Sequence, residues 1–196
     1  LALAKVKLRT SDHTDEIKSL LDGINVPALT GDEPRTYAIL RADLALAMGD
    51  VPGARKQYET ATGALSGPDA RSSIRRTARV DQARAFLDKK DFEAAQNALS
   101  DVAWQEPISK ISPDWALTQL RLYQEEGYSD MAFIWALRLL PVITDEGRSE
   151  LLLRLTDISF AQAHDDMARK ALAELLKKYP YSPEAAQAKG KWPDKI

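Results

Sequence analysis

Residues 48–65, MGDVPGARKQYETATGAL, contain a turn and a helix that recur through the rest of the chain. The Gly-Asp pair at 49–50 is typical of a tight turn. The helix after it carries apolar residues at i, i+4, i+7 and i+11, which places them on one face: Ala54, Tyr58, Ala61 and Leu65. Because this face begins with a small residue, the helix can pack closely against the helix before it, and Tyr58 fills the gap one turn later.

Four other segments repeat this pattern, with varying regularity: HTDEIKSLLDGI, KKDFEAAQNALSDV, GYSDMAFIWALRLLP and HDDMARKALAELLKKYP. One residue in each copy corresponds to Ala54, and we call these five the anchor residues: Ile17, Ala54, Ala95, Ala132 and Ala168. Successive anchors lie 36 to 41 residues apart. Such a period is typical of helical repeat proteins, in which each hairpin packs on its neighbours.

The chain resembles the tetratricopeptide repeat family, whose unit is a helical hairpin of about 34 residues. The residues that carry the resemblance are Gly49-Asp50, Ala54, Tyr58 and Ala61; Asp91-Phe92, Ala95 and Pro107; and Ala168 with Tyr179-Pro180. The family favours a small residue midway along the first helix of each unit. Ala42 and Ala83 fit this preference, whereas Leu120 and Thr156 in the later units depart from it. The spacing is slightly longer than the family's, which leaves a related helical hairpin repeat open.

The resemblance implies an all-α fold: a right-handed α-solenoid of about five antiparallel helix-turn-helix hairpins, forming a single domain over residues 1–196. The hairpins are predicted at residues 1–26, 34–66, 69–106, 113–141 and 145–180, with a capping helix at 183–192. Ser112-Pro113-Asp114 and Ser182-Pro183-Glu184 are typical helix starts. We expect loops at residues 25–34 and 104–113.

The composition excludes several classes of protein. The net charge of −2 does not favour nucleic acid or an anionic membrane as a binding partner. The chain contains no cysteine, so disulfides and thiolate metal sites are excluded. No apolar run approaches the roughly 20 residues that cross a bilayer. The chain does not begin with methionine, so we expect it to be a processed or excised piece, with targeting or anchoring segments missing.

Three groups of residues are candidate sites. His13 and His164 lie in equivalent turns beside carboxylates, where helix capping is favoured over metal binding. Arginines follow one another at four-residue steps, at Arg71, Arg75 and Arg79, which suits either a solvated helix face or an acidic ligand. Aromatic residues gather at 104–135. Phe133 and Trp135 are predicted to be core, and Trp104 and Trp115 to be either core or binding anchors.

Nothing in the sequence indicates catalysis. It contains no Gly-rich phosphate loop, no Gly-flanked serine nucleophile and no His-Glu-x-x-His motif, and its carboxylates are spread along helix faces. We therefore predict a protein that is not an enzyme and has no cofactor or metal.

In the family that the chain resembles, the first helix of each unit lines a concave groove that holds a peptide or a partner helix. The resemblance places these residues in that groove: Ile39, Asp43, Leu46, Val80, Arg84, Leu87, Leu117, Arg121, Leu153, Asp157 and Phe160. One branch of the family clamps a peptide carboxylate with lysines and asparagines. That clamp needs polar groups at four positions that are apolar in this chain: Ile39, Val80, Leu117 and Leu153. The chain therefore does not fit that branch.

We therefore expect a protein-protein interaction scaffold whose partner is a peptide or helix. Two alternatives remain open: a structural subunit whose groove is buried in a larger chain or a homo-oligomer, and a regulatory sensor of peptides or small ligands. The stretch KKYPYSPEA at 177–185 resembles unit ends of bacterial envelope tetratricopeptide proteins, which favours a periplasmic or envelope location over the cytoplasm.

Overall fold

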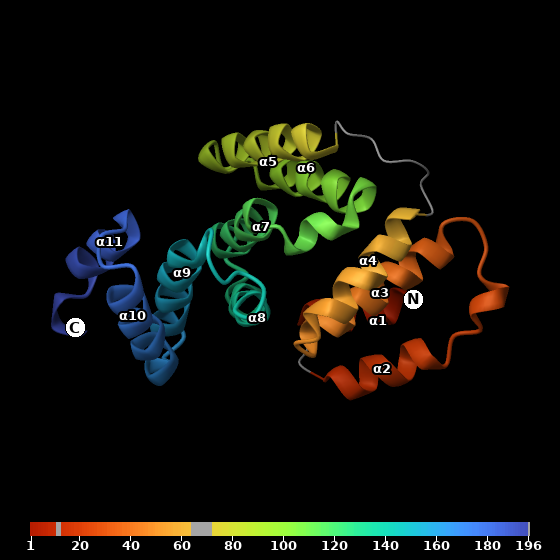
Figure 1. Cartoon of the computed structure of the whole chain (residues 1–196), viewed down its shortest axis with the longest axis horizontal. Coiled ribbons are helices and arrows are strands. Elements are labelled where there is room, and N and C mark those ends of the chain that lie inside the picture. The colour runs from red at the N-terminus through yellow and green to blue at the C-terminus, as the bar shows by residue number, and fades with distance from the viewer. Residues whose placement is uncertain (11–12, 64–71, 196) are drawn as a thin grey trace. The chain divides into compact units, whose positions relative to one another are not determined.

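The computed structural model describes residues 1–10, 13–63 and 72–195, with the side chains of residues 63 and 72–75 left aside. This part of the chain is helical and contains no β-strand. The α-helices are α1 (Ala2–Thr10), α2 (Thr14–Asp22), α3 (Glu33–Ala47), α4 (Val51–Gly63), α5 (Ser72–Asp88), α6 (Phe92–Gln105), α7 (Pro113–Glu125), α8 (Ser129–Leu139), α9 (Arg148–Ala161), α10 (Asp165–Lys178) and α11 (Pro183–Lys191) (Figure 1). Short 3-10 helices are η1 (Val26–Ala28), η2 (Pro107–Ile111) and η3 (Pro193–Lys195).

The chain divides into two compact units, unit 1 at Leu1–Trp115 and unit 2 at Ala116–Ile196. In unit 1, α1 packs with α2, α3 with α4, and α5 with α6. In unit 2, α9 packs with α10, and Trp135 Nε1 of α8 donates to the carbonyl of Ala116 in α7 at 3.0 Å. The helices thus pack in neighbouring pairs, as predicted. A single continuous domain stays a prediction.

Four of the turns inside these pairs have the same backbone geometry. Each contains a residue in the left-handed conformation: Gly49, Lys90, Gly127 and Ala163. The N–H of the next residue donates to a carbonyl five residues earlier, with the bonds Asp50 to Ala45, Asp91 to Phe86, Tyr128 to Tyr123 and His164 to Ser159. This is the Schellman motif, which satisfies carbonyls that a helix end leaves without partners. The sequence repeat is therefore also a repeat of backbone conformation.

The five anchor residues occupy equivalent places in the second helices. All five are fully buried, with 0% of their surface exposed: Ile17, Ala54, Ala95, Ala132 and Ala168. Each anchor N–H donates to the carbonyl four residues earlier, at distances of 2.9 to 3.2 Å. Their predicted equivalence is confirmed. Leu65, predicted on the same face as Ala54, lies outside the described residues.

Enlarging an anchor is expected to be costly because a buried alanine leaves no room for a longer side chain. Ala168→Leu should destabilise unit 2 by about 2 kcal/mol, through overpacking between α9 and α10. Ala173→Leu, at an exposed position of the same helix, is the matched control and should change the stability by less than about 0.5 kcal/mol. Urea denaturation followed by circular dichroism measures both. Equal midpoints for the two variants would contradict this role of the anchors.

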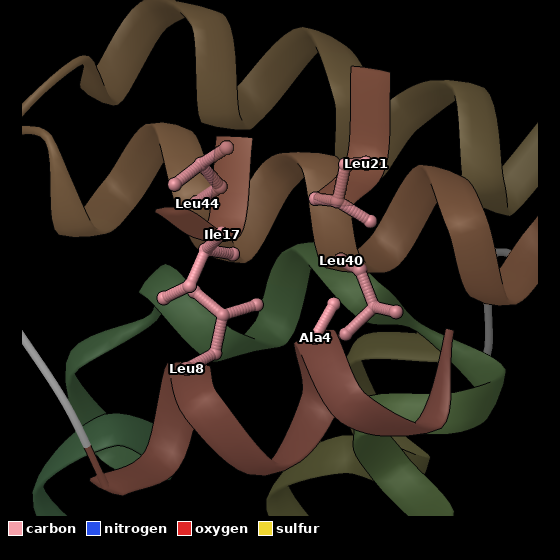
Figure 2. Packing of buried hydrophobic residues seen from close by; sticks show 6 residues of the cluster. All are labelled: Ala4, Leu8, Ile17, Leu21, Leu40 and Leu44. Carbon is pink, nitrogen blue, oxygen red and sulfur yellow. The ribbon is translucent and has the colours of Figure 1, made fainter. Parts of the chain in front are cut away.

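The first three helices share a core of aliphatic side chains. Figure 2 shows Ala4 and Leu8 from α1, Ile17 and Leu21 from α2, and Leu40 and Leu44 from α3 pointing toward one another. All six are at most 4% exposed. Here α3 contacts both helices of the preceding pair. In unit 2, α9 likewise contacts α8 of the preceding pair, and α11 contacts both α9 and α10.

The step from the α3–α4 pair to the α5–α6 pair is different. Among the described residues, the main contacts between these pairs are made by η2, which packs on both α4 and α6. Sequence analysis predicted a loop at 104–113, but α6 continues to Gln105, and η2 follows with Pro107, Ser109 and Ile111 buried. A buried 3-10 turn satisfies backbone groups that a loop at this position would leave without partners.

In unit 2, Arg148 fixes the beginning of α9. Its guanidinium donates to the carbonyls of Leu140 at 2.6 Å and Ile143 at 3.1 Å, and to the carboxylate of Glu174 in α10 at 3.0 Å. Burial by itself raises the pKa of Glu174, but hydrogen bonds from Arg148 and Lys178 outweigh it and hold this pKa below its usual value. Glu174 is therefore a carboxylate at neutral pH and links α10 to the α8–α9 connection.

Candidate partner-binding surface

The predicted groove residues fall into two groups. Five are enclosed by the chain's own packing and are at most 7% exposed: Leu46, Val80, Leu87, Leu117 and Leu153. These side chains belong to the core, because each lies on the side of its helix that packs against other elements. The other six are partly exposed: Ile39, Asp43, Arg84, Arg121, Asp157 and Phe160. Of the predicted groove residues, the six partly exposed ones are therefore those that a partner can contact.

In unit 1, Asp43 is the centre of a polar cluster that joins three elements. Tyr58 of α4, itself fully buried, donates its hydroxyl to Asp43 Oδ1 at 2.6 Å. Lys110 of η2 lies 2.7 Å from both Asp43 oxygens. The carboxylate of Asp43 is thus already bound by the chain itself, and Lys110 was not singled out in the sequence.

A second cation that sequence analysis missed is Arg35, which is only 4% exposed. Its guanidinium donates to the carbonyl of Ala61 in the last turn of α4 at 3.1 Å, and to the carbonyl of Trp104 in the last turn of α6. It also lies 4.9 Å from the centre of the Trp104 ring. Burial lowers the pKa of Arg35, against the opposing charge of Asp32, but arginine remains protonated at physiological pH.

The two tryptophans left open by the sequence differ in the structure. Trp104 is 40% exposed and has Arg35 on its ring face. Trp115 is 4% exposed, and its Nε1 donates to the carbonyl of Leu99 at 2.9 Å, so it belongs to the core of unit 1. Trp135 and Phe133, predicted to be core, are half-buried.

The described arginines of α5 are paired with the chain's own acids. Arg76 lies 3.3 Å from Glu106 and 3.4 Å from Asp114. Arg79 lies 3.9 Å from Asp101, and Arg84 lies 3.3 Å from Asp81. Such pairs fit a solvated helix face better than a site for an acidic ligand. Arg71 lies outside the described residues, and so does the side chain of Arg75.

The two histidines stand at the starts of α2 and α10, and neither side chain accepts a capping hydrogen bond. The predicted capping role of these turns is therefore not carried by the imidazoles. His164 instead stacks on Phe133, with ring centres 4.5 Å apart and an angle of 23° between the planes. Within the described ranges, no group of three or more histidines, aspartates and glutamates is placed to hold a metal ion.

Unit 2 contains a pocket of about 240 Å³ between α7, α8 and α9. The residues that line it are Gln124, Ser129, Ala132, Asp157, Ile158 and Ala161. Gln124 is held by Arg154, whose guanidinium donates to its side-chain oxygen at 3.0 Å. Asp157 is also one of the residues that the sequence analysis predicted in a groove. In the rest of the wall, Ala132, Ile158 and Ala161 are apolar and Ser129 adds a hydroxyl.

Residues of the chain's own sequence lie against Asp157 and its neighbour Phe160. The ammonium of Lys191 is paired with the carboxylate of Asp157. The ring of Trp192 lies 5.5 Å from the ring of Phe160, and Lys195 Nζ lies 5.8 Å from the same ring. We call residues 191–195 the covering segment. The exposed face of α9 thus combines a carboxylate and an aromatic ring, and both are in contact with this segment.

No family model, no curated protein and no solved structure matches this chain significantly. The likeness to tetratricopeptide repeats therefore rests on the residues given above. The described helices include none that combines the length and the apolar character needed to cross a bilayer.

Proposed function

We propose that this chain is a non-enzymatic protein-interaction scaffold, built as a right-handed stack of hairpins of the tetratricopeptide type, which binds a peptide or helix on the exposed side of α7 and α9. The recurring turns and the buried anchors support a repeat of equivalent hairpins. The assignment of the binding site rests on one observation. Asp157 lines the pocket between α7, α8 and α9, and the sequence resemblance predicts this residue in the groove.

The size and chemistry of this pocket suit a side chain of a partner. Its volume of about 240 Å³ is below the roughly 300–1,000 Å³ typical of small-molecule pockets. Ile158 and Ala161 offer apolar contact, while Asp157 places a carboxylate at the wall. Arg121, paired with Glu125 at 2.6 Å, and Phe160 are partly exposed residues of α7 and α9.

A peptide-display selection against the immobilised full chain tests this proposal. Selected peptides are then measured by fluorescence anisotropy with two variants. Ala161→Trp places a bulky ring in the pocket from an exposed position of its lining, so it should weaken binding at least tenfold. Ala173→Trp, at an exposed position of α10, is the matched control and should leave the dissociation constant unchanged.

The proposal is supported if enriched peptides lose affinity for Ala161→Trp alone. It is refuted if no peptide is enriched over an unrelated helical protein, or if the enriched peptides bind both variants as they bind the wild type. Circular dichroism must show the same helix content for all three proteins, which separates a blocked pocket from an unfolded unit.

A further inference from the structure

The covering segment lies against part of the α9 face that we propose as a binding surface, at Asp157 and Phe160. This segment begins at the last residue of α11, a helix fixed by Ala185 and Ala188, which are both fully buried. It stays close to that helix because Trp192 N–H donates to the carbonyl of Ala188 at 2.9 Å, and Lys195 N–H donates to that of Trp192 at 3.1 Å. The position of α11 therefore places Lys191, Trp192 and Lys195 together against α9.

The contacts match in charge and in ring chemistry. Lys191 provides a cation for the carboxylate of Asp157, and its Nζ also lies 5.1 Å from the centre of the Trp192 ring. The rings of Trp192 and Phe160 are tilted by 46°, and the 5.5 Å between their centres is within the range of attractive aromatic pairs. The covering segment thus presents a lysine followed directly by an aromatic residue, and α9 presents the complementary groups.

None of these contacts is sealed from solvent. The side chain of Lys191 is 50% exposed and that of Asp157 is 28% exposed, and ion pairs with this exposure contribute little to stability. The buried residues of α11 are Ala185 and Ala188, and neither belongs to the covering segment. A partner with the same groups is therefore able to compete for α9 without unfolding unit 2.

We infer that the covering segment is an internal occupant of the partner site, and that the partner is a peptide segment with a lysine or arginine beside an aromatic residue. This inference rests on the proposed function and names the class of partner for the same site. Because the internal occupant is tethered, it competes at an effective concentration in the millimolar range, so the intact chain binds such a peptide weakly.

The test compares a released variant with a control of matched composition. Lys191→Ala combined with Trp192→Ala removes the cation and the ring that cover α9. Lys189→Ala combined with Tyr181→Ala removes one cation and one ring at exposed positions, since Tyr181 is 98% exposed. The probe is a fluorescein-labelled peptide with the sequence of residues 187–195, QAKGKWPDK, measured by anisotropy at 150 mM salt.

We expect the released variant to bind the probe at least tenfold more tightly than the wild type, and the control to bind it as the wild type does. Adding Asp157→Asn to the released variant keeps the side-chain shape, removes the charge and should cancel the gain. A second probe, with alanine at the lysine and tryptophan that correspond to Lys191 and Trp192, should not bind. Circular dichroism confirms the helix content of every variant.

Equal affinities for the released variant, the control and the wild type would overturn the inference, and so would equal binding of the two probes. These failures are distinct from failure of the proposed function. If displayed peptides are enriched and are blocked by Ala161→Trp while the released variant shows no gain, α9 binds partners but the covering segment does not occupy their site. If no displayed peptide is enriched and the probe does not bind, both proposals fail.

Discussion

Arg35→Met is expected to destabilise unit 1 by about 3 kcal/mol. Arg35 is buried and donates to the carbonyls of Ala61 and Trp104, which lie at the ends of α4 and α6, where helix carbonyls lack partners in their own helix. Its charge also faces the negative ends of two helix dipoles. Methionine fills much of the same space but removes the hydrogen bonds that Arg35 donates to both carbonyls, and hydrogen bonds to charged groups contribute about 1.5–3 kcal/mol each.

Hydrogen exchange followed by mass spectrometry measures this effect within unit 1. A loss of about 3 kcal/mol corresponds to amides in α3, α4 and α6 that exchange about a hundredfold faster. Arg35→Lys should recover part of the loss, because an ammonium keeps the charge but not the fork that reaches two carbonyls. Arg55→Met, at an exposed position of α4, is the control. Exchange rates equal to those of this control would show that Arg35 is not needed at the helix ends.

The second large effect is expected at Asp43. Asp43→Ala should cost about 2–3 kcal/mol, because it leaves the ammonium of Lys110 and the hydroxyl of Tyr58 without their shared acceptor. The side chains of Lys110 and Asp43 are only 17% and 24% exposed, so water replaces the carboxylate poorly. Lys110→Met in the Asp43→Ala background removes the uncompensated charge and should restore part of the stability.

Urea denaturation of the two single variants and the double variant forms a cycle that isolates the pair. We expect a coupling free energy of about 1–2 kcal/mol, within the range found for residues in direct contact. Tyr58→Phe separates the hydroxyl from the ion pair and should cost about 1 kcal/mol. The single variants are Asp43→Ala and Lys110→Met. If their losses of stability add up to that of the double variant, Asp43 and Lys110 act independently and other contacts hold η2 in place.

These two clusters show how much of the predicted site was accessible from the sequence. Asp157 and Phe160 were expected in a groove, and the structure gives them partly exposed positions on α9. Asp43 was expected there as well, but Lys110 and Tyr58 occupy its carboxylate. Five other residues that the resemblance placed with them are buried: Leu46, Val80, Leu87, Leu117 and Leu153. Helical spacing identifies a face, but it does not say which neighbour covers that face.

The parts of the fold that the sequence predicted correctly are local. The Gly-Asp turn and the Ser-Pro-Glu start of α11 depend on residues within a few positions of one another. Their backbone preferences are set by sterics and by capping hydrogen bonds, which act at short range along the chain. Lys90 and Ala163 take the left-handed place that glycine takes in the other turns, so the motif tolerates other residues when the surrounding helices fix it.

The sequence by itself determined the helix pairing, the four recurring turns described above and the positions of the five anchors, because these follow from local geometry and from the period of apolar residues. Only the tertiary structure decided which cation meets which acceptor. Arg35 and Trp104 are 69 residues apart, Lys110 and Asp43 are 67 apart, and Lys191 and Asp157 are 34 apart. The sequence positions of charged residues have no period that identifies their partners. Two charged groups come within hydrogen-bonding distance only when the elements that carry them, such as α9, η2 or the covering segment, are packed in the tertiary structure.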